Sequence, residues 1–224
     1  MSTLLSKEDC LEMEKQLSHP SGQKGIDFAK VMFKKNSNMI DFCFSQLDLE
    51  YNDKLLELGF GNGSHLKVLN QKDIKSIKYF GAEISGTMIK EAAKNIIEFE
   101  SNHRFNLTEY DGRVLPYSDN FFNKVVMINA IYFIEEPFIF LSEIYRTLIY
   151  GGNCHIAFVE KDSMEKLPFV ENRFRLYSEY SFQNLIEQTG FQLIKKIQKE
   201  EETVTQNGDV INRIYSIFVL KKRR

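Results

Sequence analysis

The sequence predicts an α/β protein: a three-layer sandwich in which a mainly parallel, seven-stranded sheet ends in an antiparallel β-hairpin and carries helices on both faces. Three observations lead to this prediction. Short apolar runs alternate with longer amphipathic ones over residues 54–160, as in a parallel sheet flanked by helices. A glycine-rich turn at residues 59–63 directly follows the first apolar run. Asn207-Gly208 separates the last two strand-like runs, which is a strong hairpin signal.

Five strands and three helices are expected in the alternating region. The short apolar runs place strands at residues 54–58, 79–84, 105–110, 124–128 and 154–159. The amphipathic stretches place helices at residues 64–71, 87–99 and 137–150. Gly151-Gly152 would form the C-terminal cap of the last helix.

The two ends of the chain depart from this alternation. Ser178 would cap a helix that Gly190 ends, and strands follow at residues 191–198 and 210–220. Before the alternating region, apolar residues recur near helical spacing from Ile26 to Leu47, with a polar interruption at residues 36–38. We expect one broken helix or two short ones in this leader.

Composition favours an intracellular globular protein of one domain. The chain has 224 residues, with 29 Lys and Arg against 31 Asp and Glu. Such a balance gives no broad positive field to hold a nucleic-acid backbone. Three widely spaced cysteines fit neither a disulfide framework nor a metal site. Because no signal peptide or run of about 20 apolar residues is present, we expect a cytoplasmic protein with no membrane partner and no bound metal.

The turn that contains Gly59, Gly61 and Gly63 has the form of a nucleotide-cofactor site. A predicted strand leads straight into it, and a predicted helix follows. Glycines let the backbone turn tightly and approach a ligand, while the start of a helix presents unpaired N–H groups. A tight connection without a ligand would use the same glycines, so the turn needs a second observation.

Glu83 supplies that observation. It lies 24 residues after Gly59, at the end of the second predicted strand, where an acidic side chain can accept hydrogen bonds from both ribose hydroxyls. A helix-capping carboxylate is the alternative, but Ser85 or Thr87 could fill that role. A dinucleotide fingerprint would have its last glycine where Ser64 stands. An NAD-linked oxidoreductase is therefore the weaker interpretation.

Several stretches resemble the motifs of the class I, Rossmann-like S-adenosylmethionine-dependent methyltransferases, of the small-molecule type with a methyltransferase-11-like domain. Residues 56–63, Leu-Glu-Leu-Gly-Phe-Gly-Asn-Gly, resemble the first motif, and residues 109–112, Glu-Tyr-Asp-Gly, the third-strand motif. Residues 124–133 resemble the fourth strand and the loop after it. The order and spacing of these matches agree over residues 54–220.

The resemblance implies S-adenosyl-L-methionine as the cofactor and S-adenosyl-L-homocysteine as its product. Gly59, Gly61 and Gly63 would pass beside the methionine and ribose portions, and Glu57 would support this loop. Glu83 matches the ribose-binding acid of the family.

The resemblance also implies cofactor contacts from the next two strands. Asp111 would bond the adenine amino group, although a turn aspartate before Gly112 would look the same. Gly112, Ile84 and Asn129 complete the implied cofactor-binding set. Asn129 is followed by Ala130, not by the Asn-Pro-Pro-Tyr type tetrapeptide of the enzymes that methylate amide or exocyclic amino nitrogens.

No residue is named as catalytic. The sulfonium already activates the methyl group, so the protein mainly aligns a nucleophile with it and excludes water. Tyr132, Glu160 and His19 are candidates for a base, but Tyr132 reads equally as a packing aromatic and His19 as an ordinary loop residue. The leader, the loop at Tyr132-Phe133 and residues 162–176 would close over the methyl end, around a partly apolar pocket for a small organic acceptor.

We expect residues 1–50 to form a helical extension that covers the active site, and residues 51–224 to form the methyltransferase domain. Three alternatives are open: an NAD-linked Rossmann oxidoreductase, a methyltransferase-like binding protein without turnover, and a protein or nucleic-acid methyltransferase, which the near-neutral charge disfavours. The sequence identifies neither the acceptor nor the oligomeric state.

Overall fold

A computed structural model describes residues 6–71, 76–97, 104–204 and 210–223. It contains one seven-stranded sheet in the order β3-β2-β1-β4-β5-β7-β6. The strands are β1 (Lys54–Leu58), β2 (Lys78–Glu83), β3 (Arg104–Glu109), β4 (Phe122–Ile128), β5 (Leu148–Val159), β6 (Phe191–Val204) and β7 (Val210–Lys222). Pairing is parallel from β3 to β5 and antiparallel where β7 joins β5 and β6. The predicted fold class is confirmed.

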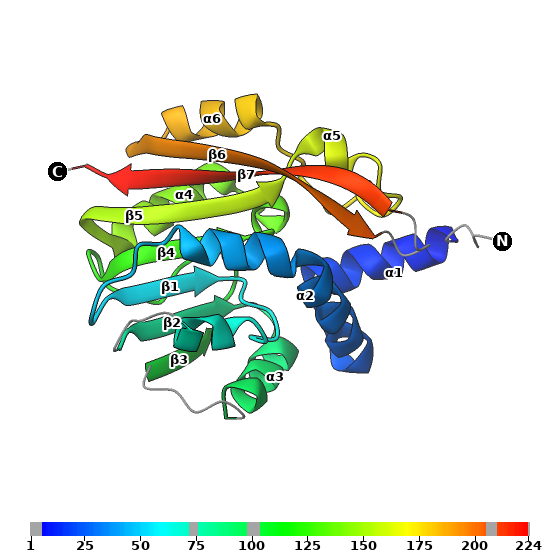
Figure 1. Ribbon diagram of the computed structural model, residues 1–224, viewed down its shortest axis with the longest axis horizontal. Helices are drawn as coiled ribbons and strands as arrows, with labels where there is room; N and C mark the ends of the chain where they lie inside the picture. Colours follow the sequence, from blue (N-terminus) through cyan, green and yellow to red (C-terminus); the bar gives the residue numbers. More distant parts are fainter. Residues whose placement is uncertain (1–5, 72–75, 98–103, 205–209, 224) are drawn as a thin grey trace.

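Helices cover the sheet on both sides. They are α1 (Lys7–Ser18), α2 (Gly22–Ser45), α3 (Gly86–Ile97), α4 (Pro137–Thr147), α5 (Lys161–Met164) and α6 (Glu179–Glu187), with short 3₁₀ helices η1 (Leu66–Gln71) and η2 (Ile131–Phe133). In Figure 1, α2 passes in front of the sheet and α4 lies behind it. Because both faces are covered, the central strands read as near-continuous apolar runs: Leu55, Leu56, Val125 and Val126 are fully buried.

The carboxyl ends of β1, β2 and β4 point to the same side of the molecule, where α1 and the lower part of α2 lie (Figure 1). The loops that follow parallel strands therefore gather at one edge of the sheet, which is where open α/β sheets bind ligands. All the sequence-predicted cofactor residues lie at or next to this edge, in β1, β2 or the segments that follow β1, β2, β3 and β4.

Two local predictions around the helices were wrong. The expected helix at residues 64–71 is only a 3₁₀ helix that begins at Leu66. The expected helix end at Gly151-Gly152 lies inside β5, because α4 already ends at Thr147. The pairing of β4 with β5 shifts register just there. Gly151 adopts φ 83°, so this glycine serves an irregularity in a strand rather than a helix cap.

The leader contains two helices, and the second is not broken. α2 runs continuously through residues 36–38, where an interruption was predicted. Figure 1 shows it changing direction partway along its length. Arg213 of β7 donates to the Lys35 carbonyl and to Asn36 Oδ1, both at 2.9 Å. A side chain that bonds into the hydrogen-bond ladder is a known cause of helix bending.

The C-terminal predictions are largely confirmed. The Ser178 hydroxyl caps α6 by accepting the Ser181 N–H at 3.2 Å. β6 and β7 pair antiparallel as expected, but β6 extends to Val204, six residues beyond the predicted end. The predicted turn at Asn207-Gly208 lies outside the described residues.

Candidate active site

The glycine turn after β1 adopts a backbone that other residues rarely take. Gly59, Gly61 and Gly63 have φ of 72°, 57° and 65°. A Cβ at Gly59 would lie 2.8 Å from the Ala130 Cβ, and one at Gly63 would lie 2.9 Å from the Ala92 Cβ. A Cβ at Gly61 would meet nothing within 4 Å. Two of the glycines therefore let the protein pack on itself, while Gly61 borders open space.

Glu83 ends β2 directly beside this turn. Its buried carboxylate accepts the Gly61 N–H at 3.0 Å through Oε2, and the N–H groups of Ile84 (2.8 Å) and Ser85 (3.1 Å) through Oε1. Burial raises the pKa of Glu83, and these three hydrogen bonds oppose the shift. A carboxylate has about four acceptor positions, so Glu83 keeps capacity for a further donor.

Glu57 lies under the turn in a buried polar cluster. Its carboxylate accepts the Tyr79 hydroxyl at 2.7 Å, and His65 Nε2 lies 2.9 Å from it. Burial, reinforced by the neighbouring Glu57, places the pKa of Tyr79 well above its usual range. His65 was missed by the sequence analysis, because its only signal was a polar residue shortly after the glycines. The cluster holds the floor of the turn in place.

Two adjoining cavities open at this edge of the sheet. The narrow cavity has a volume of about 160 Å³, and the broad cavity has a volume of about 500 Å³. The residues that line both are Leu17, Pro20, Gly59, Gly61, Ile128, Asn129 and Phe133. The glycine turn and the end of β4 thus form a common wall, and a ligand in one cavity can reach the other.

Most of the sequence-predicted cofactor residues meet at the narrow cavity. Its lining includes Gly59, Gly61, Glu83, Ile84, Gly112 and Asn129. Glu57 lines only the broad cavity, and Gly63 lines neither. Tyr110, which the sequence analysis did not select, lies in the narrow lining directly before Asp111.

Asp111 is exposed and lines neither cavity. Its Oδ1 accepts the N–H groups of Arg113 at 2.8 Å and Val114 at 2.9 Å, and these bonds lower the pKa of the carboxyl. This is the geometry of a turn aspartate. An adenine contact would have to come from its second oxygen.

Asn129 follows β4 with a left-handed backbone, φ 55°. Its Oδ1 lies 3.1 Å from the Tyr132 hydroxyl, which also accepts the Val159 N–H at 2.6 Å. Tyr132 is buried, and burial raises its pKa far above the usual range. The hydroxyl is thus engaged in hydrogen bonds to Asn129 and Val159, which is the packing role that the sequence also allowed for Tyr132.

The other two candidate bases lie outside the cavities. Glu160 accepts the Ser216 hydroxyl at 2.5 Å and the Glu179 N–H at 2.8 Å, and it lines neither cavity. His19 is exposed in the turn between α1 and α2 and lines neither cavity, although Pro20 lines both. No catalytic residue is assigned.

The three segments expected around the acceptor pocket all line the broad cavity. These are the leader between Gln16 and Ile40, the Tyr132-Phe133 loop, and residues 163–174. Residues from the far ends of β6 and β7, including Thr203 and Arg213, complete the wall and were not anticipated. Hydrogen bonds from Ser85 and Asn172 anchor the leader. The Ser85 hydroxyl donates to the Pro20 carbonyl, and the Glu14 carboxylate accepts the N–H (2.7 Å) and Nδ2 (2.8 Å) of Asn172.

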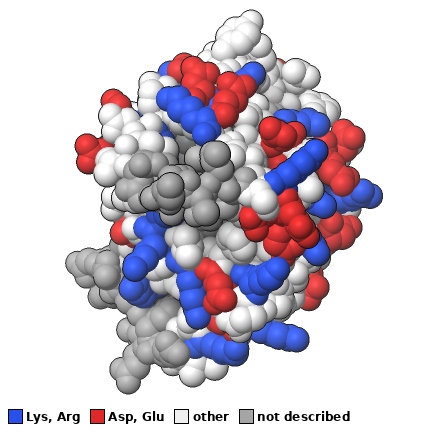
Figure 2. All heavy atoms as spheres, turned by 90° about the vertical axis from the view of Figure 1, so that its right-hand side faces the viewer, with Lys and Arg blue, Asp and Glu red and all other residues white. Residues whose placement is uncertain are grey.

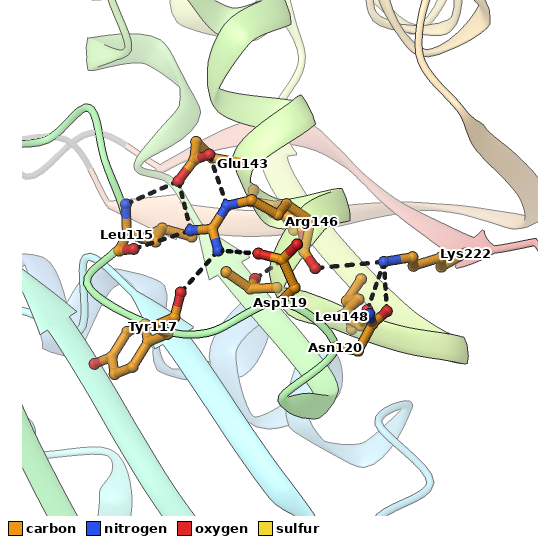
Figure 3. A network of polar contacts seen from close by, with 10 residues as sticks. Leu115, Tyr117, Asp119, Asn120, Glu143, Arg146, Leu148 and Lys222 are labelled. Carbon is orange, nitrogen blue, oxygen red and sulfur yellow. Dashed lines mark hydrogen bonds and ion pairs between the residues drawn. The ribbon is translucent and has the colours of Figure 1, made fainter.

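The loop that carries Gly112 is held at its far end by Arg146 of α4. Arg146 donates to the carbonyls of Leu115 (3.1 Å) and Tyr117 (2.8 Å) and pairs with Asp119 and Glu143 (Figure 3). Lys222 nearby donates to Asn120 Oδ1 and to the carbonyls of Arg146 and Leu148 (Figure 3). This network lies away from the cavities, so it fixes the loop without occupying the site.

Comparison with known proteins agrees with this geometry. A family model described as a methyltransferase domain matches residues 56–156, which include the end of β1, the glycine turn and Glu83. This match and the methyltransferase relatives support a class I S-adenosylmethionine-dependent methyltransferase. The uncharacterized methyltransferase YdaC of Bacillus subtilis is 23% identical over 133 residues, covering 59% of this chain and 71% of YdaC.

Two further relatives extend the match beyond that core. The ubiquinone/menaquinone biosynthesis C-methyltransferase UbiE of Coxiella burnetii is 23% identical over 163 residues, which cover 73% of this methyltransferase and 61% of UbiE. A solved S-adenosylmethionine-dependent methyltransferase from Aquifex aeolicus has a TM-score of 0.61 at 16% identity, covering 86% of this chain and 97% of that one. These comparisons give no support to the NAD-linked alternative.

The methyltransferase shows no candidate metal centre within residues 6–71, 76–97, 104–204 and 210–223. Across the same described ranges, none of the helices is long and apolar enough to cross a membrane.

Proposed function

We propose that this methyltransferase binds the adenosine part of S-adenosylmethionine in the narrow cavity and methylates a small organic acceptor held in the broad cavity. One observation carries the proposal. Gly61 borders open space and lines both cavities, and its N–H donates a hydrogen bond to the Glu83 carboxylate. When bound, the cofactor supplies a methyl group activated by a sulfonium, and loss of that methyl group leaves S-adenosylhomocysteine.

The residues of the narrow cavity fit the cofactor. The remaining acceptor capacity of Glu83 suits the ribose hydroxyls, which are hydrogen-bond donors. The missing side chain at Gly61 lets the ligand lie directly against the main chain. Ile84, Gly112 and Asn129 complete the wall, and Asp111 would approach the adenine from the exposed loop.

The walls of the broad cavity position the acceptor and exclude water from it. Aromatic side chains dominate part of this wall: Phe174 lies 4.7 Å from Phe133 and 5.7 Å from Tyr132 between ring centroids. A concave, mostly apolar pocket with few polar groups is typical of small-molecule sites. The relative UbiE, named for C-methyl transfer in ubiquinone and menaquinone biosynthesis, supports a small organic acceptor.

The charges on the side of the molecule that carries the site do not favour a nucleic acid. Figure 2 shows Lys and Arg interspersed with Asp and Glu across this face, without a broad field of one sign. A nucleic-acid backbone is held by clustered positive charge. A small acceptor therefore suits this face better than a nucleic acid.

Calorimetric titration with S-adenosylmethionine, S-adenosylhomocysteine and NADH tests the proposal. We expect the first two to bind and NADH not to bind. Glu83→Ala should weaken binding of both by about tenfold or more, because bonds to a buried carboxylate are charge-assisted. Glu109→Ala is the matched control, since Glu109 ends the neighbouring strand, pairs with Glu83 in register and lines neither cavity.

Three results would contradict the proposal. NADH binding in place of S-adenosylmethionine would restore the oxidoreductase alternative. Equal effects of the Glu83 and Glu109 substitutions would remove the assigned ribose contact. Cofactor binding without methyl transfer to any member of a broad small-molecule panel would favour a binding protein over an enzyme with this acceptor class.

A further inference from the structure

Lys35 places an uncompensated positive charge in the wall of the broad cavity. It lies on α2, is half-buried and lines the cavity. Among the described residues, no acidic group pairs with its ammonium. Burial and then the charge of Arg213 lower the pKa of Lys35. A cation that is partly removed from water without a partner is unfavourable. A negatively charged ligand would therefore stabilise the Lys35 ammonium.

The neighbouring cation does not share this property. Arg213 also lines the cavity, but its Nε donates to Glu201 Oε1 at 2.8 Å and its Nη2 pairs with the same oxygen. Its other bonds go to Asn36 and the Lys35 carbonyl. Glu201 therefore neutralises the charge of Arg213, and the positive charge of Lys35 stays available to a ligand in this part of the broad cavity.

No acid elsewhere in the described lining offsets Lys35. Glu57 is the one acidic residue among the lining residues that the structure describes, and its carboxylate is already engaged by Tyr79 and His65. Lys166 adds a second, exposed cation to the wall. The cavity thus combines a positive surplus with a surface formed largely by side chains such as Phe28, Met32, Phe33, Phe169 and Phe174.

We propose that the methyl acceptor is an apolar molecule that carries an anionic oxygen group, and that Lys35 binds this group. The inference rests on the proposed function, because it assigns the broad cavity to the acceptor. A carboxylate or similar oxyanion would accept a charge-assisted hydrogen bond from the ammonium, while its apolar body would pack against the phenylalanines. Cationic acceptors would be repelled by Lys35 and Lys166.

Two ring-matched probes test the proposal. Binding of 2-naphthoate and of its neutral analogue 2-naphthamide is measured by calorimetry on the full chain, with and without saturating S-adenosylhomocysteine. We expect 2-naphthoate to bind about tenfold more tightly than the amide. Lys35→Met should remove this preference without changing the affinity for the amide, and Lys35→Arg should keep most of it.

Lys34→Met is the matched control, because Lys34 is the exposed neighbour on the same helix and lines neither cavity. Equal or absent binding of the two probes to the wild type would overturn the proposal, as would an equal loss in the Lys34 and Lys35 variants. Titration of S-adenosylhomocysteine into each variant separates the two hypotheses. Intact cofactor binding without an anion preference refutes only the acceptor class, whereas absent cofactor binding refutes the proposed function.

Discussion

The narrow and the broad cavity share one wall but are built in different ways. Apart from three leader residues, the narrow cavity is formed by strand ends and the segments that follow them within residues 58–134. Its Gly61 and Glu83 are only 22 positions apart. The broad cavity is formed by side chains from the leader, from residues 163–174 and from the far ends of β6 and β7. In the proposed function, the cofactor is thus held by a short, regular pattern, while the acceptor meets loop and leader surfaces that follow no such pattern.

The largest effect is expected at Glu57, in the buried cluster under the glycine turn that both cavities share. Glu57→Leu should lower the free energy of unfolding by about 3 kcal/mol, because the Tyr79 hydroxyl and His65 each lose a buried partner. Urea denaturation measures the loss. Glu57→Gln keeps an acceptor for Tyr79 and should lose less; equal losses would show that the charge, and not the hydrogen bond, matters.

A smaller effect is expected at Gly61, where a matched glycine distinguishes the loss of cofactor binding from the effect of backbone strain. Gly61→Ala and Gly151→Ala each introduce a Cβ at positive φ into open space, so each should lower stability by about 1 kcal/mol. Only Gly61→Ala should also weaken S-adenosylmethionine binding, by about tenfold or 1.4 kcal/mol. If Gly151→Ala weakens cofactor binding as much, Gly61 has no special place beside the ligand.

The broad cavity should respond to loss of an aromatic side chain without any change in cofactor affinity. Phe174→Ala removes ring contacts with Phe133 and Tyr132 and should weaken 2-naphthoate binding by about 1 kcal/mol, roughly fivefold. Phe138→Ala is the control, since Phe138 is exposed on α4 and lines neither cavity. An equal loss of S-adenosylmethionine affinity would contradict the assignment of cofactor and acceptor to separate cavities.

The smallest effect is expected at Asp111, at the margin of the narrow cavity. Asp111→Asn keeps an oxygen for the turn and should lower S-adenosylmethionine affinity by no more than about threefold, because a contact from an exposed side chain is weak. Calorimetry beside the exposed control Asp162→Asn measures it. A tenfold loss would show that Asp111 closes over the adenine in the complex.

The same contrast explains what the sequence could predict. The β1 strand, the glycine turn and Glu83 follow local patterns of hydrophobicity and spacing, and the structure places Gly61 and Glu83 in direct contact. The glycines at 151–152 misled the prediction, since a glycine serves a helix cap and a strand irregularity equally well.

The broad cavity was only partly foreseeable. The aromatic and leader segments could be named, but the contribution of Thr203 and Arg213 depends on how far the hairpin extends and where it crosses α2. The free charge of Lys35 depends in turn on Glu201 engaging Arg213. Such pairings join residues far apart in the chain, and no local pattern encodes them.

The contact between Arg213 and α2 also bears on the order in which the molecule forms. It joins residues 177 and 178 positions apart, and contacts of such long range form late because closing the intervening chain costs entropy. During synthesis, β1 and β2 can pair and bring Glu83 to the glycine turn long before residue 213 leaves the ribosome. The nascent chain therefore acquires the proposed place for the cofactor first, and the proposed enclosure for the acceptor only when almost the whole chain has been made.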